Sequence, residues 1–147
     1  MRNERARLPG TTGEPGRLRK KGDMTDSTYQ GWSNYETWLV SLWLDNDQGS
    51  YDYWRDRAAS FRRGAPTSRN VLEGIWTATE AARFGLADAL KEAIVEDSPL
   101  EDASVYSDLL NAALYEVNWD EIAGDLLYEE AARGQESDSE APSSDKE

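Results

Sequence analysis

The sequence contains no cysteine and no histidine among its 147 residues. Without cysteine the chain can form no disulfide, no thiolate zinc site and no cysteine nucleophile. Without histidine it also lacks the commonest metal ligand and the commonest general base at neutral pH. The sequence shows no Gly-rich phosphate loop and no Gly-x-Ser-x-Gly nucleophile elbow. These absences predict a non-enzymatic protein that has no catalytic residues, no bound metal and no cofactor.

Long apolar stretches are also missing, and only 38% of the residues are hydrophobic. No run approaches the roughly 20 residues that a membrane-spanning helix needs, and no charged-then-apolar signal segment opens the chain. We therefore expect a cytoplasmic protein that does not contact membranes. Six Trp and seven Tyr supply much of the apolar mass, and buried rings of this size can sustain a core that contains few residues.

The formal net charge of −13 is unevenly distributed. Residues 1–22 hold seven of the 16 basic residues and two of the 29 acidic ones, which leaves nine basic and 27 acidic residues after them. Twelve acidic residues and no basic one lie between Lys91 and Arg133. A surface of this sign repels nucleic acid and attracts cationic partners, although the same charge could serve only to keep the protein soluble.

Composition divides the chain into three parts. Residues 1–28 form a basic extension with almost nothing apolar to bury, and we expect it to be disordered. Residues 1–23 are either an upstream extension that precedes a natural start at Met24 or a basic arm that touches nucleic acid. Residues 29–133 form a single helical domain, and residues 134–147, rich in Ser, Asp and Glu, form a disordered acidic tail.

Apolar residues at helical spacing predict an all-α fold, an irregular bundle of five to six helices with disordered termini. Ser33 and Glu36 fit a capping box at the start of the first helix, and Ser50 fits the N-cap of the second. The residues of these two helices that are predicted to face the core are Tyr35, Trp38, Leu39, Leu42, Trp43, Tyr51, Trp54, Ala58 and Phe61.

The pattern from Thr67 to about Asp97 is helical but less regular, and Gly85 is expected to break or kink it. Another helix start is predicted at residues 98–101, where Pro99 fits the first helical position. The apolar stripe of this region is Val71, Leu72, Ile75, Ala78, Ala82, Leu86, Leu90 and Ile94, followed by Leu109, Leu110, Ala113, Leu114 and Val117.

The last helix is predicted to begin with a second capping box, formed by Asn118 and Glu121, and to end at Gly134. Its predicted core face is Trp119, Ile122, Ala123, Leu126 and Leu127.

Three aspartates between the first two helices invite comparison with a calcium loop. Counted from Asp45, however, the sixth position is Ser50, where an EF-hand loop needs glycine, and the twelfth is Asp56 rather than glutamate. A helix end followed by an N-cap explains the same residues. Carboxylate pairs such as Glu92 and Glu96, or the group Glu116, Asp120 and Glu121, could hold Mg²⁺, but chance proximity is expected in so acidic a chain.

The body of the protein has one basic cluster, and we expect its arginines to pair with the acidic last helices or to form a solvated face. They are Arg55, Arg57, Arg62, Arg63 and Arg69. Stacking of single-stranded nucleic acid on aromatic rings needs a basic groove beside the rings. Because Trp38, Trp43, Trp54 and Trp119 are predicted core residues, we expect no direct nucleic-acid binding by the folded body.

The acidic C-terminal half is the feature that most suggests a binding surface. Carboxylates spaced along helices can imitate the phosphates of duplex DNA, and ordinary surfaces mix both signs of charge. The alternative is the solvated face of an amphipathic bundle. The candidate partner-binding residues are Asp102, Asp108, Glu116, Asp120, Glu121, Asp125, Glu129 and Glu130.

Two sequence blocks carry a resemblance to known proteins. The first is GWSNYETW at residues 31–38, which continues to LWLDND at 42–47, and the second is SDLLNAAL at 107–114 with EVNWDEIA at 116–123. Together with LADALK at 86–91 they resemble a group of small uncharacterised acidic proteins encoded by bacteriophages, plasmids and bacterial genomes. The resemblance implies a setting in mobile elements and their hosts, and it carries no catalytic residue.

These observations lead to one function and two alternatives. We expect a non-enzymatic interaction protein of a phage or mobile element that binds a basic host or phage protein in the host cytosol, with counter-defence by DNA mimicry as its sharpest form. One alternative is a regulatory or assembly factor that uses the same acidic face without mimicking DNA. The other is a carboxylate-metal-dependent enzyme.

Overall fold

The structure, a computed structural model, describes residues 28–139, with side chains through residue 136. Its helices are α1 (Tyr35–Asn46), α2 (Gln48–Gly64), the 3₁₀ turn η1 (Ala65–Thr67), α3 (Arg69–Leu72), α4 (Ala78–Glu96), α5 (Val105–Tyr115) and α6 (Trp119–Ser139). Helix α3 is a single turn, and no strand occurs within the described residues. The predicted all-α irregular bundle is confirmed. The basic extension, apart from Thr28, and residues 140–147 of the acidic tail lie outside the described residues.

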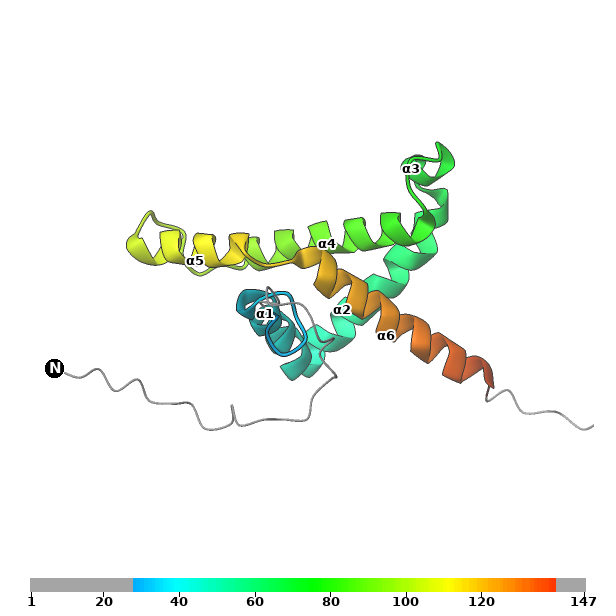
Figure 1. Cartoon of the computed structure of the whole chain (residues 1–147), viewed down its shortest axis with the longest axis horizontal. Coiled ribbons are helices and arrows are strands. Elements are labelled where there is room, and N and C mark those ends of the chain that lie inside the picture. The colour runs from blue at the N-terminus through cyan, green and yellow to red at the C-terminus, as the bar shows by residue number, and fades with distance from the viewer. Residues whose placement is uncertain (1–27, 140–147) are drawn as a thin grey trace, which may run out of the picture.

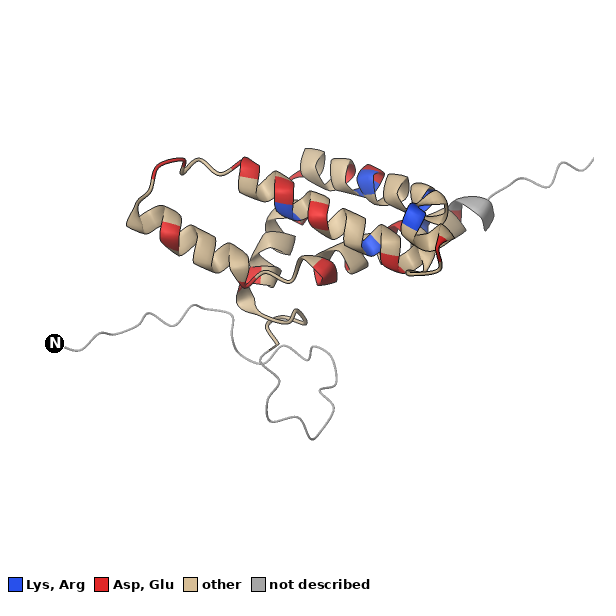
Figure 2. Ribbon diagram, turned by 90° about the horizontal axis from the view of Figure 1, so that it is seen from above, with Lys and Arg blue, Asp and Glu red and all other residues tan. Residues whose placement is uncertain are grey.

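Helices α2, α4 and α6 cross one another and pack pairwise to form the centre of the bundle (Figure 1). After the loop that follows α4 the chain reverses direction into α5, which stands apart from α4 when seen from above (Figure 2), and α1 lies beneath these two helices in the view of Figure 1. The chain then changes direction sharply at the end of α5, and α6 returns across α2 and α4.

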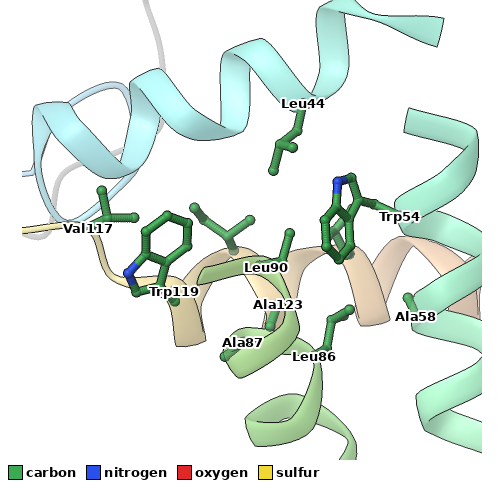
Figure 3. Close-up of a cluster of buried hydrophobic side chains, with 11 residues drawn as sticks. Leu44, Trp54, Ala58, Leu86, Ala87, Leu90, Val117, Trp119 and Ala123 are labelled. Atoms are coloured by element: carbon green, nitrogen blue, oxygen red, sulfur yellow. The ribbon is translucent and has the colours of Figure 1, made fainter. Parts of the chain in front are cut away.

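The core lies where α2, α4 and α6 meet (Figure 3). Leu86 and Leu90, one turn apart on α4, are fully buried, and Ala58 and Ala123 are small enough to let the helices approach closely. Trp54 and Trp119 are buried at two sides of this cluster, as predicted. Each fully buried leucine side chain stabilises the fold by about 1.5–3 kcal/mol relative to exposure.

Helix α4 runs through Gly85 without interruption, so the expected break is wrong. A Cβ atom placed on Gly85 would lie 2.8 Å from Cε1 of the Phe61 ring, far inside van der Waals contact. The glycine is therefore explained by the close approach of α2 to α4 rather than by a change in helix direction. The irregular pattern before it reflects a division into η1, α3 and α4, and α4 begins with a capping box between Thr77 and Glu80.

Two predicted N-caps are displaced along the chain. Asn34, not Ser33, caps α1, and its side chain accepts a hydrogen bond from the backbone N–H of Thr37. Asp47, not Ser50, caps α2 and accepts from the Ser50 N–H at 2.8 Å. Asn, Asp and Ser can all serve as N-caps, so a sequence with two of them in nearby positions does not decide which one caps the helix.

Two further boundaries differ from prediction. Helix α5 begins after Ser104, which forms a capping box with Ser107, and residues 98–101 belong to the preceding loop. Helix α6 continues through Gly134 to Ser139, since a single glycine weakens a helix without ending it.

Several residues that were predicted to face the core are exposed instead. Trp38 is half-buried, and its ring packs against the rings of Tyr29 and Tyr35 with centroids 5.0 and 5.6 Å away. No element of the described chain fully covers the remaining side chains. They are Tyr35, Trp43, Leu72, Ile75, Leu109 and Ala113.

Candidate protein-binding groove

An apolar groove of about 440 Å³ opens between α1, the C-terminal part of α4, and α5. Leu39 and Trp43, one turn apart, belong to the α1 wall, and Leu110 and Leu114, one turn apart, belong to the α5 wall. Ile94 of α4 completes the apolar lining between these helices. The groove is therefore bounded mainly by the side chains of helices, together with Asp47 and Val117 from the turns that follow α1 and α5.

Helix α1 forms a wall because it is apolar around most of its circumference. Thr37, Ser41 and Leu44 are buried against the body of the protein, whereas Leu39 and Trp43 lie on the side that faces the groove. A helix with apolar residues on every side has more of them than one core can cover. Sequence reasoning missed the groove, although this surplus in α1 is a signal that could have indicated it.

Exposed apolar side chains extend the groove beyond its walls. Trp43 is 71% exposed at the groove, and Tyr106 and Leu109 on α5 are 71% and 65% exposed. Within α5 only Ser107 is buried. Tyr106 and Leu109 lie one turn before the lining residues Leu110 and Ala113 and so on the same side of α5. Exposed apolar surface of this kind is typical of protein-binding sites in soluble proteins.

A joint of hydrogen bonds, formed by Asn34, Thr37, Glu116 and Asn118, holds α1 against the turn between α5 and α6. Thr37 is fully buried; its hydroxyl donates to Asn34 Oδ1 over 2.6 Å and accepts from the backbone N–H of Asn118 over 2.9 Å. The Asn34 side chain in turn donates to the backbone carbonyl of Glu116 over 2.6 Å. Because Val117 lies between these partners and lines the groove, the joint fixes the groove at one end.

Glu121 adds a second tie between the same segments. Its backbone N–H donates to the Asn118 side chain, as the predicted cap requires. Its carboxylate, however, accepts from the backbone N–H of Ser33 at 3.2 Å rather than from Asn118. The predicted capping box is thus half present, and its carboxylate links α6 to the residues before α1.

The charged residues of the two chain segments that form the α1 and α5 walls are all carboxylates. Residues 28–47 contain three acidic residues and residues 92–118 contain seven, and neither stretch contains Lys or Arg. Glu36 and Asp47 contribute directly to the lining. In Figure 2 the arm made by α5 and the loop before it carries acidic segments and no basic one. The basic residue nearest to these stretches in the sequence is Lys91 on α4.

On the opposite side of the molecule, ion pairs between helices neutralise some of the carboxylates. Arg62 of α2 pairs with Glu130 of α6 at 2.8 Å, and Arg83 of α4 pairs with Asp120 of α6 at 2.9 Å. The predicted pairing of basic residues with the last helix is confirmed for Arg62, whereas Arg55 and Arg69 pair locally with Asp52 and Glu73. Within residues 28–136 these four ion pairs involve no carboxylate of α1 or α5.

The eight candidate partner-binding carboxylates do not form a single row. Asp102 lies in the loop before α5, Asp108 is exposed on α5, and Glu116 is exposed at its end. The other five lie on α6, which runs in a different direction from α5 (Figure 1). Asp120 and Glu130 of these five pair with arginines, and Glu121 accepts from Ser33, as described above. Asp125 and Glu129 lie close enough to Asp45 of α1 to repel its carboxylate.

Asp45, near the end of α1, lies where carboxylates from both sides of the molecule meet. Partial desolvation of this side chain, which remains exposed to water, and repulsion from Glu129 and Asp125 of α6 raise the pKa of the Asp45 carboxyl above its ordinary value. Asp47 acts as the cap of α2. Among residues with described side chains, no three acidic groups come together in an arrangement that could hold a metal ion.

Comparison with known proteins places the chain in a family. Residues 25–130 match the model of DUF7249, a family of unknown function. The chain belongs to the DUF7249 family. Neither a curated protein nor a solved structure gives a match. The DUF7249 match covers α1 to α5 and more than half of α6, and so includes the whole groove.

The two sequence blocks singled out above meet in this DUF7249 structure. Asn34 and Thr37 come from the first block, and Glu116, Asn118 and Glu121 come from the second. Their side chains and backbone form the joint rather than a reactive centre. None of the described helices combines the length and the apolar character needed to cross a membrane.

Proposed function

We propose that this protein is a non-enzymatic binding protein that docks a basic protein partner in the groove between α1 and α5. The observation that carries the proposal is an open apolar groove surrounded by carboxylates with no compensating cation on either wall. Protein interfaces combine an apolar centre with a polar rim, and exposed Trp residues such as Trp43 are frequent binding hot spots. The acidic surroundings would select a partner of opposite charge and speed its association.

The proposed setting is a phage or other mobile element, with a host or phage protein as the partner in the host cytosol. The support for this setting is the resemblance of the two sequence blocks to proteins of such elements. The regulatory or assembly role and the counter-defence role both remain compatible with a docking groove, because both require a specific protein partner.

Duplex-DNA mimicry has weaker support than groove docking. A mimic needs unpaired carboxylates along a continuous surface, whereas Asp120 and Glu130 are paired with arginines at 2.9 and 2.8 Å. The carboxylates of α5 and α6 also follow two different directions (Figure 1). An apolar groove has no counterpart on a phosphate surface, and its conspicuous exposed residues favour a protein side-chain partner.

Affinity capture from a bacterial lysate tests the proposal. The groove variant combines Trp43→Ser and Leu109→Ser, and the control variant combines Tyr128→Ser and Leu72→Ser, which remove similarly exposed apolar residues from α6 and α3. We expect a salt-sensitive partner that wild type and control retain and that the groove variant loses. Equal capture by all three proteins would reject the groove, and displacement of the partner by duplex DNA would favour mimicry.

A further inference from the structure

We infer that the groove takes a single amphipathic helix whose apolar stripe is flanked by Lys or Arg. The inference rests on the proposed function and specifies the partner. It follows from the shape of the walls, from the absence of backbone partners along them, and from the sign of the charge around them.

The walls are built to pack against a helix. On α1 the lining runs from Glu36 to Asp47, which at 1.5 Å per residue is about three turns or 16 Å. On α5 it runs from Leu110 to Leu114, a little over one turn, and Val117 of the following turn continues it. Side chains at spacings of three and four residues form ridges, and a helix whose own ridges have these spacings fits between them. A docked helix of about 11 residues would cover the length of the α1 wall.

An extended segment finds no comparable support. Strand addition needs the free backbone N–H and carbonyl groups of a sheet edge, and within residues 28–139 there is no strand. The backbone groups of α1 and α5 are used inside their own helices, so a partner can contact these walls only through side chains. A helix satisfies its own backbone and presents only side chains, which makes it the suitable occupant.

Charge excludes a second copy of this chain as the favoured occupant. Each copy carries a net charge of −13, and a symmetric dimer through the groove would bring two sets of rim carboxylates together. The most basic helix of the chain, α2, already uses Trp54 and Ala58 in its own core. A helix with Lys or Arg beside its apolar stripe, by contrast, would place cations next to Glu36 and Asp47, the two carboxylates of the lining.

Synthetic peptides test the inference on the full chain. The probe is a fluorescein-labelled 14-residue peptide with Leu at helical positions i, i+3, i+4, i+7, i+8 and i+11 and Lys elsewhere. Three controls are a scrambled peptide of the same composition, a peptide with Glu in place of Lys, and one with a central proline. Binding is measured by fluorescence anisotropy in low salt and in about 0.5 M salt, where the Debye length falls to a few ångströms.

We expect the Lys-Leu helix to bind and each control peptide to bind at least about tenfold more weakly, the loss typical of one interface hot spot. The Trp43→Ser, Leu109→Ser variant should lose about tenfold, while the Tyr128→Ser, Leu72→Ser control keeps full affinity. Neutralising the lining carboxylate Glu36 with Glu36→Gln should weaken binding in low salt and have little effect in high salt.

The possible failures separate the two proposals. Equal binding of the helical, scrambled and proline peptides would overturn the helix inference, because only charge would then be recognised. If the groove variant nevertheless loses its captured partner, the proposed function stands alone. If the groove variant retains both peptide and partner, both proposals fall. A dimer that the peptide dissociates, measured by light scattering, would assign the groove to a second copy.

Discussion

The side of the molecule formed by α2, α4 and α6 differs from the side formed by α1 and α5 in how much apolar surface is buried and how many carboxylates are paired. Where α2, α4 and α6 cross, the apolar residues are buried and the carboxylates Asp120 and Glu130 have arginine partners. Around α1 and α5, Trp43 and Leu109 are exposed and the carboxylates have no cation on the same helices. The first side is complete as a folded structure, whereas the second has the composition of an interface without its partner.

The comparison teaches that net charge alone says little about where a partner binds. Most of the twelve carboxylates between Lys91 and Arg133 look equivalent in the sequence. In the fold, those on α6 contribute mainly to internal ties, and those on the α5 arm face solvent beside an apolar surface. Exposed ion pairs contribute little to stability. Their effect here is to neutralise carboxylates of α6, whereas the carboxylates of α1 and α5 keep their charge.

The largest effect is expected from two tryptophan substitutions that contrast the two sides. Trp119→Ala removes a ring that is 9% exposed and should lower the free energy of unfolding by about 3–5 kcal/mol. Trp43→Ala removes a ring that is 71% exposed and should cost less than about 1 kcal/mol. Urea unfolding followed by circular dichroism measures both. Equal losses would mean that α1 is as tightly packed as the core.

The joint that connects the two sides can be broken with Thr37→Val, which preserves shape and removes the hydroxyl. The Asn118 N–H, which donates to the buried Thr37 hydroxyl, then loses its acceptor, and we expect a loss of about 1–2 kcal/mol in the free energy of unfolding. Thr79→Val on the exposed side of α4 is the matched control and should be nearly neutral. A silent Thr37→Val would show that α1 is held by apolar contacts alone.

Two glycines within the packed side should respond with opposite signs to alanine. Gly85→Ala places a Cβ 2.8 Å from the Phe61 ring, and the overpacking should outweigh the gain in helix propensity for a net loss of about 1 kcal/mol. Gly134→Ala meets nothing within 4 Å and should raise the thermal midpoint slightly. If both variants gain stability, Phe61 moves aside and the α2–α4 contact is looser than described.

The smallest effect is expected at Asp45, where the two sides meet. A carboxyl whose pKa is raised on folding contributes stability below its unfolded pKa, near 3.8, and loses that contribution as pH rises through the folded value. At pH 7 the ionised group is therefore unfavourable. Asp45→Asn should stabilise by less than about 1 kcal/mol at pH 7, because water screens the group, and should change little near pH 3. Asp102→Asn gives the baseline for removing one loop charge.

Helix types and most of the central core could be predicted from the sequence. Trp54, Leu86, Leu90 and Trp119 are buried as their spacing indicates, because the core is wide enough to take a full apolar face from α2, α4 and α6. Boundaries were less predictable, since Asn34 and Ser33 can both cap a helix and only the contact with Thr37, itself held by Asn118, decides between them.

The groove could not be predicted because periodicity identifies an apolar face without showing whether anything covers it. Trp43 and Leu109 have the spacing of core residues and lie outside the core because α1 and α5 stand apart from each other along the groove. Glu121 shows the same limit for polar residues: its position fits a capping box, yet its carboxylate reaches Ser33, 88 residues earlier in the chain.

The single buried residue of α5 has a consequence for motion. The helix is held at its C-terminal end, where the Glu116 carbonyl accepts from Asn34 and Val117 is buried, while Ser107 is its only buried contact further out. Segments with so little burial open at a small fraction of the global unfolding free energy. We therefore expect α5 to move about its C-terminal end while α1 stays in place. Such a movement would change the width of the groove to suit the diameter of a bound segment and would leave the core unchanged.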